Sequence, residues 1–334
     1  MKKLFIIVIF IGTSALIAGG YYYLQYRQFL LSPVFPQTTV VNINQGQNFK
    51  SFIKNIHKNH ASGDNWQWRL LARLEQVDKW LKVGEFQIGA ELTPMQMLRK
   101  INANEVITYQ FTIIEGMNWR DLKQKLLLDP VLIQSLADIS DAQLLAQLDS
   151  DKILPEGLFL PETYQFVRGD SDIDVLKRAY IALQQGLAKY WHEKKLGLPL
   201  TSPYEMLTLA SIVEKETSQA SERETIAGVF IRRLQLNMRL QTDPTVIYGL
   251  GVNYDGDIKS KDLVTDTPYN TYTRKGLPPT PIAMASIESI AASANPQEGT
   301  ALYFVANNRG GHYFSDTYEQ HKKAVKKYLT GVKL

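Results

Sequence analysis

Residues 4–24 form an uninterrupted stretch without a charged side chain, LFIIVIFIGTSALIAGGYYYL. At a rise of about 1.5 Å per residue, a helix of this length crosses a hydrocarbon core of about 30 Å. Lys2 and Lys3 precede the stretch and three tyrosines at 21–23 end it, which is typical of the two polar boundaries of a membrane helix. The sequence therefore predicts an N-terminal membrane-spanning helix, so that the rest of the chain folds on one side of a membrane.

The same segment permits a second interpretation, a signal peptide that is cleaved. Ala18 and Gly20 form a small-x-small pattern at which such a leader can be cut. We favour an uncleaved anchor, because the apolar run continues past this point into the tyrosines. The positive charge before the segment predicts a cytoplasmic N-terminus. Both interpretations export the following domains, and the first predicts a single-pass protein of the inner (cytoplasmic) membrane with a periplasmic or extracytoplasmic catalytic domain.

The composition limits the classes of function. The chain has 334 residues, of which 45% are hydrophobic and 21% charged, as expected for two modules that each bury a core. A net charge of +4 without a run of like charges gives no indication of nucleic-acid binding. The chain has no cysteine, which excludes disulfides and thiolate metal sites.

Metal and cofactor motifs are also missing from the sequence. His57 and His60 are three residues apart without an evident third ligand, and His192 and His321 lie among lysines. None of the patterns of serine hydrolases, P-loop nucleotide-binding proteins or zinc proteases occurs. We therefore expect neither a metal nor a cofactor.

Residues 201–248 contain the clearest helical pattern of the chain. Ser202 and Glu205 form a capping box, and Pro203 suits the first position of a helix. Apolar residues then recur at helical spacing, at Met206, Leu209, Ala210 and Val213.

Two further helix starts follow in the same stretch. Ser221 and Glu224 form a second capping box, which predicts a helix from 221 to about 234. Asp243 and Pro244 are a typical N-cap and first helical residue, so we expect a third helix there with Asp243 as its cap.

Glu214 and Glu216 lie in the last turn of the first of these helices. A carboxylate at a helix C-terminus opposes the macrodipole, so the placement is unfavourable and invites a functional explanation. The alternative is that both are solvated acids beside Lys215, the usual state of charged residues. On a helical wheel both fall at the edges of the apolar arc. The residues alone therefore leave two candidates for a partly buried acid.

Several segments resemble, in the same order, the endolytic murein transglycosylases of the MltG (YceG-like) type. They are EGLFLPETY at 156–164, ASIVEKET at 210–217, MRLQTDPTVIYGLG at 238–251, PYNTYT at 268–273, GLPPTPI at 276–282, and LYFVA and GGHYF within 302–314. The resemblance covers essentially the whole chain after the N-terminal segment. It implies that the first glutamate of the (I/V)EKE motif, here Glu214, is the catalytic acid. A structural ion pair is the favoured role of Glu216.

The resemblance implies a peptidoglycan lytic transglycosylase, a lyase of cell-wall biogenesis. Such an enzyme cleaves the β-1,4 bond between N-acetylmuramic acid and N-acetylglucosamine inside nascent glycan strands, and it leaves a 1,6-anhydro end. The C6 hydroxyl of the muramic acid is the nucleophile, so a single carboxyl group can act as acid and then as base, where ordinary glycosidases use two. That carboxyl needs a raised pKa, which the apolar residues at 207–213 can provide.

The expected partners also follow from the resemblance. They are the peptidoglycan strands, the membrane and the peptidoglycan synthases, with no nucleic acid, and the enzyme would act as a terminator of glycan elongation. The alternative function is a membrane-anchored scaffold that binds peptidoglycan without cleaving it. An intact Glu214 in its motif favours the enzyme.

The family motifs supply candidates for sugar contacts, because aromatic faces stack on pyranose rings and amides or hydroxyls bond acetamido groups. For each of them a structural role is the alternative, and for Gln241 and Asp243 a role in the turn is favoured. The candidate substrate-binding or supporting residues are Glu216, Gln241, Asp243, Tyr248, Tyr269, Asn270, Thr271, Tyr272 and His312.

Residues 38–104 predict a small β-α-α-β module, with strands at 40–43 and 83–88, helices near 49–56 and 64–80, and a trailing helix from 94 to 101. This order resembles a LysM-like module, which the family carries before its catalytic domain and which binds N-acetylglucosamine glycans. A packing or spacing domain is the alternative.

The remaining chain mixes strands and helices without regular βαβ alternation, which predicts the α+β class. In it we expect a helical segment at 130–152, a helix at 283–292, a strand pair at 301–306 and 313–314, and a C-terminal helix at 317–330. The predicted domains are a cytoplasmic tip and transmembrane helix (1–28), a connector (29–37), the LysM-like module (38–104) and the transglycosylase domain (105–334).

Overall fold

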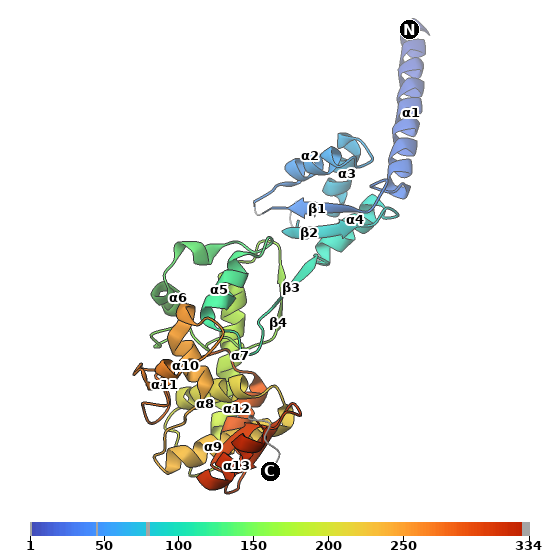
Figure 1. The fold of residues 1–334 in the computed structure, drawn as a ribbon. Coiled ribbons are helices and arrows are strands. Elements are labelled where there is room, and N and C mark those ends of the chain that lie inside the picture. The colour runs from blue at the N-terminus through green and yellow to red at the C-terminus, as the bar shows by residue number, and fades with distance from the viewer. Residues whose placement is uncertain (1, 45, 78–80, 329–334) are drawn as a thin grey trace. The chain divides into compact units, whose positions relative to one another are not determined.

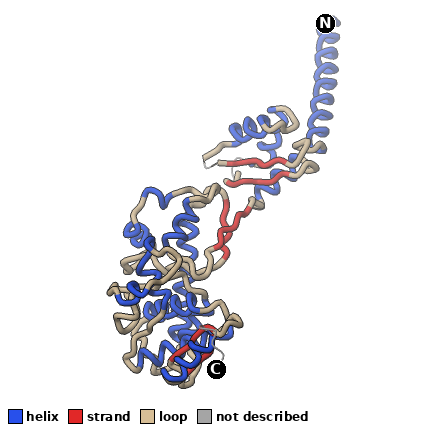
Figure 2. The backbone as a smooth tube through the Cα atoms, viewed as in Figure 1, coloured by secondary structure: helices blue, strands red, loops and turns tan. Residues whose placement is uncertain are grey.

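The computed structural model describes residues 2–44, 46–77 and 81–328, and it has the mixed α+β composition expected from the sequence. Helices predominate, and the strands occur in short antiparallel pairs (Figure 2). The chain divides into two compact units (Figure 1). The first comprises Met1–Tyr109 and Phe166–Gly169, and the second comprises Gln110–Gln165 and Asp170–Leu334.

Helix α1 (Lys2–Leu31) contains the uncharged stretch. Its segment Phe5–Leu31 has a mean hydropathy of 1.9 and is long and apolar enough to cross a membrane. The helix extends to Leu31, beyond the point at which the sequence predicted a connector. The reason is packing, because Phe29 is buried in the core of the first unit with its ring 5.1 Å from that of Trp68.

The first unit follows the predicted order of elements. Strands β1 (Thr39–Ile43) and β2 (Gly84–Ile88) pair antiparallel, with Val41 opposite Phe86. The helices are α2 (Phe49–Lys58), α3 (Asn65–Glu75) and α4 (Pro94–Asn102). Helix α3 ends before the predicted boundary at residue 80, and the predicted helical residue Trp80 lies outside the described residues.

The second unit begins around strand β3 (Thr108–Thr112), which pairs with β4 (Thr163–Val167). Between and after these strands lie α5 (Trp119–Leu127), α6 (Asp141–Gln147) and the long α7 (Asp172–Glu193). The predicted helix over 130–152 is wrong for most of its length, since α6 and a short 3-10 helix at Ser135–Asp138 are its only regular elements.

Polar side chains explain why residues 130–140 do not continue as a helix. Asp129 accepts hydrogen bonds from the backbone N–H groups of Val131 and Leu132 at 2.9 and 3.1 Å, which is a turn conformation. Asp172, which is fully buried, accepts from the N–H groups of Ser135 and Leu136. These side chains replace the intrahelical acceptors of the backbone.

The core of the second unit is built around α8 (Pro203–Glu216), which packs on α7, α9 (Arg223–Gln235) and α12 (Ile287–Ala294). All eight residues from Met206 to Val213 are buried, so α8 is surrounded by protein along most of its length.

Two helices and a hairpin complete the unit beside this core. They are α10 (Asp243–Leu250), α11 (Ser260–Val264), and strands β5 (Tyr303–Ala306) and β6 (His312–Ser315), followed by α13 (Tyr318–Tyr328). The strand pair confirms the predicted one, with Val305 opposite Tyr313. Helix α13 packs on both strands of this hairpin.

Two predicted helix starts in this unit are wrong. Residues Ala220–Glu222 form a 3-10 turn, and α9 begins at Arg223 without a side-chain cap, because the Glu222 carboxylate binds elsewhere. Helix α12 starts at Ile287, four residues later than predicted, because Ser286 caps it by accepting a hydrogen bond from Ser289 N.

Candidate active site

The end of α8 holds the three charged residues of the EKE motif. Ser202 begins the helix, as predicted, and its hydroxyl accepts a hydrogen bond from the backbone N–H of Glu205 at 3.2 Å. Successive helical residues point about 100° apart, so Glu214, Lys215 and Glu216 face three different surroundings. These surroundings separate the two candidate acids that the helical wheel could not separate.

Glu214 is held by donors of the protein itself. Its Oε2 accepts a hydrogen bond from Ser286 N at 2.9 Å and another from the Ser286 hydroxyl, at the N-terminus of α12. Arg223 Nη2 lies 3.6 Å from the other oxygen. The Glu214 side chain is 5% exposed and lines neither of the two cavities near the end of α8.

Arg223 joins Glu214 to a third charged residue, Glu115. Its Nη2 lies 3.4 Å from Glu115 Oε2. Partial burial and the neighbouring charge of Glu214 raise the pKa of Glu115, while Arg223 acts in the opposite direction. The three charges join α8, α9 and the segment after β3.

Glu216 lines a cavity of about 470 Å³, called the Glu216 cavity below. The cavity lies between the end of α8, the start of α10 and the C-terminal hairpin. Glu216 Oε1 accepts a hydrogen bond from the Thr242 hydroxyl. Four other candidate residues line the same cavity, namely Gln241, Asp243, Tyr272 and His312.

The surroundings of Glu216 change its acidity. Burial raises its pKa from the usual 4.5 to about 7, and the negative charge of Asp243 acts in the same direction. The hydrogen bond from Thr242 and the nearby His312 and Arg233 act against this rise. A carboxyl group with such a pKa is protonated in part of the molecules at neutral pH, so it can donate a proton and accept one.

Asp243 is a second carboxylate in the Glu216 cavity. The predicted role as helix cap is wrong, because Thr242 holds the N-cap position and Asp243 is the first residue of α10. Its Oδ1 accepts a hydrogen bond from the Tyr272 hydroxyl at 2.5 Å. Burial, this hydrogen bond and the charge of Asp243 raise the pKa of Tyr272, so the tyrosine stays a neutral donor.

Two other candidates, Asn270 and Thr271, are almost fully buried and support the loops beside the cavity. Thr271 Oγ1 accepts from Thr242 N at 3.1 Å, and Thr271 O accepts from Gln241 N at 3.2 Å. Asn270 Oδ1 accepts from Tyr272 N at 2.8 Å, and its amide nitrogen donates to the carbonyls of Asp262, Leu263 and Thr265. These bonds place the neighbours of Glu216 and leave Asn270 and Thr271 without an exposed face for a sugar.

His312 is fixed by Glu222. Its Nδ1 lies 2.7 Å from Glu222 Oε2, and its backbone N–H donates to Oε1 at 2.8 Å. A carboxylate only accepts, so Nδ1 carries the proton and Nε2 of the neutral ring is left as an acceptor. Glu222, which sequence reasoning assigned to no site, therefore clamps the hairpin to α9 and orients a side chain of the cavity.

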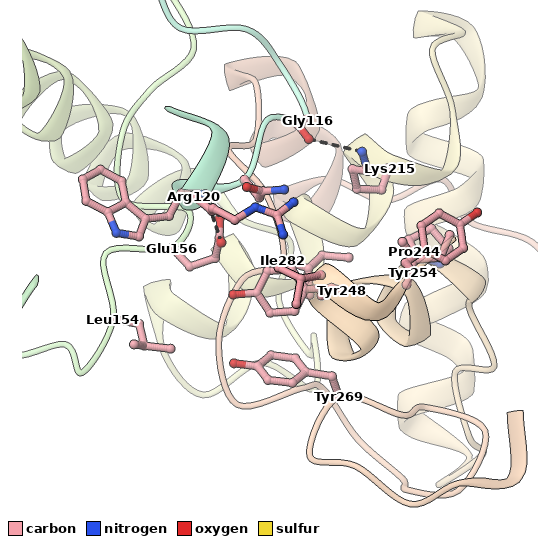
Figure 3. A pocket seen from close by; sticks show the side chains of 15 residues that line it. Gly116, Arg120, Leu154, Glu156, Lys215, Pro244, Tyr248, Tyr254, Tyr269 and Ile282 are labelled. Carbon is pink, nitrogen blue, oxygen red and sulfur yellow. Dashed lines mark hydrogen bonds between the residues drawn. The ribbon is translucent and has the colours of Figure 1, made fainter. Parts of the chain in front are cut away.

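The remaining candidates, Tyr248 and Tyr269, lie in a different cavity, of about 540 Å³ (Figure 3). Their rings are in edge contact with centroids 4.7 Å apart. Trp119 and Tyr254 also line it, and we call it the aromatic cavity. The candidate residues for sugar contacts are thus divided between two cavities.

Glu156 is a lining residue of the aromatic cavity that sequence reasoning missed. Both of its oxygens accept from Trp119 N, at 3.0 and 3.1 Å, and it is 4% exposed. Burial raises its pKa to about 7, against the hydrogen bonds of Trp119 and Tyr248. The signal was present in the sequence as an acid before the apolar run at 158–160. Gly157, with φ at +74°, is required there because a Cβ would lie 2.4 Å from that of Pro281.

A metal centre is not evident at either cavity. Among residues 2–44, 46–77 and 81–328, no group of three histidine, aspartate or glutamate side chains is placed to hold a metal ion. His57, considered as a ligand from the sequence, has its Nε2 2.9 Å from the Gly63 carbonyl oxygen.

Comparison with known proteins identifies the family to which these motifs belong. The model of the YceG-like family matches residues 41–327. The chain belongs to the YceG-like family. The match begins within the first compact unit, covers nearly all of the second, and includes all the residues of the two cavities.

This YceG-like chain is 29% identical over 343 residues to the endolytic murein transglycosylase of Bacillus subtilis strain 168, covering 94% of this chain and 92% of that protein. It is 27% identical over 364 residues to the endolytic murein transglycosylase of Streptococcus pneumoniae strain D39. That match covers 98% of this chain and 65% of the longer streptococcal protein.

A solved structure is also similar to this YceG-like chain. The crystal structure of a YceG-like protein from Listeria monocytogenes is 29% identical and superposes with a TM-score of 0.57. The alignment covers 86% of this chain and 99% of that one.

Proposed function

We propose that this chain is an endolytic murein transglycosylase whose general acid and base is Glu216. The function is that of its relatives, of which the Bacillus protein is matched over 92% of its length. The observation that carries the assignment of the acid is that Glu216 both lines a cavity and has a pKa near neutrality. No other acid of the EKE motif combines these two properties.

The family resemblance implies this role for Glu214, and the surroundings of the two carboxyl groups favour Glu216 instead. Oε2 of Glu214 accepts from Ser286 and Oε1 faces Arg223, so a substrate would have to displace Ser286 to reach Oε2 and would meet Arg223 at Oε1. Glu216 has one oxygen bound by Thr242 and borders open space. We assign Glu214 to the joint between α8 and α12.

The proposed reaction follows from these positions. Protonated Glu216 donates its proton to the glycosidic oxygen between N-acetylmuramic acid and N-acetylglucosamine, and the bond from C1 to this oxygen breaks. The C6 hydroxyl of the muramic acid attacks C1, and Glu216, now a carboxylate, takes the hydroxyl proton. The new C1–O6 bond closes a 1,6-anhydro ring, and no water is consumed.

Neighbouring polar groups have supporting roles in this proposal. The Tyr272 hydroxyl orients Asp243, and His312 offers Nε2 as an acceptor for a sugar hydroxyl or amide. Gln241 is exposed at the edge of the cavity and has both a donor and an acceptor for an acetamido group.

One observation favours a second function, a glycoside hydrolase. Asp243 lies in the same cavity as Glu216, and a pair of carboxyl groups is what hydrolysis requires. In that reaction Asp243 would act as the nucleophile or would activate a water, and its hydrogen bond with Tyr272 would be broken or shared. The two functions differ in the end that they leave on the glycan.

The product decides between them. We expect digestion of purified murein in ¹⁸O-water to yield 1,6-anhydro-N-acetylmuramic acid ends without ¹⁸O, and the early products to be long chains. Mass analysis of the new ends measures both. Incorporation of ¹⁸O at C1 would establish hydrolysis, with Asp243 as the second carboxylate. A scaffold that binds murein without cutting it would yield no new ends.

We also propose the placement of the parts around the membrane. Residues 1–28 form the cytoplasmic tip and the membrane anchor, 29–37 the connector, and 38–104 a LysM-like module that binds glycan. Residues 105–334 form the catalytic domain on the periplasmic or extracytoplasmic side of the inner membrane, where peptidoglycan synthases and growing strands are within reach. The β-α-α-β order of the first unit and the span at Phe5–Leu31 support this arrangement.

A further inference from the structure

We propose that the aromatic cavity binds the acidic peptide stem that muramic acid units carry, with Arg120 and Lys215 as the residues that recognise its carboxylates. The inference rests on the proposed function, because it extends the same substrate site. It names a specificity that neither the family nor the relatives' names describe.

The two cavities are lined by consecutive residues of the chain. Lys215 lines the aromatic cavity and Glu216, the next residue, lines the other. Likewise Asp243 lines the Glu216 cavity and Pro244 lines the aromatic cavity. Consecutive Cα atoms are about 3.8 Å apart. The two cavities therefore lie against the same two segments, the end of α8 and the start of α10, on different sides of them.

The aromatic cavity has mostly apolar walls with a few polar groups. Tyr248, Tyr269 and Ile282 lie close together along it, and the Arg120 side chain extends toward them (Figure 3). Apolar side chains form much of the rest of the lining, at Leu154, Ile247, Val252 and Trp119. Apolar walls with a few placed polar groups are typical of a ligand site. A short peptide rich in alanine has methyl groups for such walls.

Two positively charged side chains line the aromatic cavity. Arg120 and Lys215 are exposed. Lys215 Nζ donates to the Gly116 carbonyl at 3.2 Å, and Arg120 uses Nε for Asp121 at 3.1 Å. An ammonium and a guanidinium group have further donors, so both side chains can also bind a ligand.

Glu156, the acid that lines the aromatic cavity, does not neutralise the charges of Arg120 and Lys215. The oxygens of Glu156 are occupied by Trp119 N, and burial raises its pKa to about 7, so part of the molecules carry no charge there at neutral pH. Asp121, which is not a lining residue, forms an ion pair with Arg120 Nε at 3.1 Å, so Lys215 and the outer nitrogens of Arg120 are the cationic donors that the lining offers. Cationic donors form stronger, charge-assisted hydrogen bonds with carboxylates than with uncharged sugar oxygens, and the stem peptide ends in carboxylates.

The direct test is binding to the full-length protein in nanodiscs, measured by calorimetry. The probes are N-acetylmuramyl dipeptide and the same molecule with its carboxylates amidated. We expect the acidic probe to bind about tenfold more tightly, as charge-assisted hydrogen bonds do. The R120Q/K215Q variant should lose this preference, and R120K/K215R should retain most of it. K189Q, which removes an exposed cation of α7 outside both cavities, is the matched control and keeps the preference.

A cleavage assay separates this inference from the proposed function. Strands with intact stems and strands from which an amidase has removed the stems are compared by the ratio of their kcat/KM values. We expect the wild type to have a lower KM for the strands with stems than for the strands without them. The R120Q/K215Q variant should lose this difference in KM, while its kcat on the strands with stems changes little. Equal affinity for both probes would overturn the inference even if both strands are cut. If no anhydro products form but the acidic probe still binds more tightly, the proposed reaction is overturned and this inference is kept.

Discussion

Glu214 and Glu216 are two residues apart at the end of one helix and have different neighbours, and the proposed mechanism gives them different functions for that reason. Glu214 meets a helix N-terminus and Arg223, which suit a permanently bound carboxylate. Glu216 meets Thr242, Asp243 and open space, which suit a group that exchanges its proton. At the scale of a single residue, catalytic competence is thus a property of the surroundings.

The matched pair of glutamine variants tests this assignment. We expect E216Q to lower murein cleavage by about 10²–10⁴ or more, because an amide cannot donate the proton, while the fold is kept. We expect E214Q to keep most of the activity at low temperature and to lower the Tm by several degrees, because a buried charge-assisted hydrogen bond worth about 2 kcal/mol is lost. Anhydro-product formation and thermal unfolding of both variants are the measurements. The opposite pattern would return the catalytic role to Glu214.

The pKa of Glu216 also predicts a pH dependence of stability. Below pH 4.5 the group is protonated in both the folded and the unfolded chain. Between pH 4.5 and about 7 only the unfolded chain ionises, so the folded state loses stability as the pH rises. Above about 7 both are ionised and the loss stays constant, at up to about 3 kcal/mol.

An amide in place of the Glu216 carboxyl group cannot titrate, so the E216Q variant should gain stability relative to the wild type as the pH rises from 4.5 to about 7. Denaturant unfolding of both proteins at several pH values measures the difference. The pKa of Glu156 is raised in the same way, but this residue is present in both proteins, so its contribution to the difference in stability cancels. A difference that stays constant across this range would contradict the raised pKa of Glu216.

At the scale of elements, the site depends on the joint between α8 and α12. Ser286 caps α12 through Ser289 N and at the same time donates to the carboxylate at the end of α8. One side chain therefore fixes the start of one helix against the end of another. The hairpin β5–β6 is joined to α9 in a comparable way, through His312 and Glu222.

A serine-to-alanine pair isolates the energy of this joint. S286A should lower the free energy of unfolding by about 2 kcal/mol, since it removes a cap and one donor to a buried carboxylate. S140A, which removes the cap of α6 at an exposed site through Gln143 N, should cost only about 1 kcal/mol or less. Equal losses in denaturant unfolding would mean that the bond between Ser286 and Glu214 contributes little.

At the scale of the whole molecule, the apolar helix α1, which is long enough to cross a membrane, belongs to the first unit. Helix α1 ends inside the core of the first unit, where Phe29 contacts Trp68. The Gln67 side chain adds a hydrogen bond to the Gln25 carbonyl at 3.0 Å. Helix α1 is thus a continuous part of the first unit.

The topology of the anchor is tested with reporters. We expect a C-terminal fusion to a reporter that works only in the cytoplasm to be inactive, and a fusion to an exported phosphatase to be active, because Lys2 and Lys3 keep the N-terminus inside. A fusion lacking residues 1–28 is the control and should reverse both signals. Cytoplasmic reporter activity from the full chain would show that the second unit is not exported.

The sequence by itself determined the elements whose signals are local. The uncharged run predicted α1, the cap at Ser202 and the helical spacing predicted α8, and alternation with turn residues predicted the pairs β1–β2 and β5–β6. These predictions hold because a cap or an apolar period acts within a few residues of the chain. Where a remote side chain supplied the hydrogen bonds, as Asp172 does for residues 135 and 136, the local prediction was wrong.

The site was decided by the tertiary structure. The order of the motifs indicated the segments that form the candidate site. It did not predict that Tyr248 and Tyr269 line one cavity and Tyr272 another, and it did not indicate Glu156 as a lining residue. The surroundings of Glu214 come from Ser286 and Arg223, and those of Glu216 from Thr242 and Asp243. Burial and charge at a carboxyl group depend on distances in space, and segments that are far apart along the chain supply those distances only after it has folded.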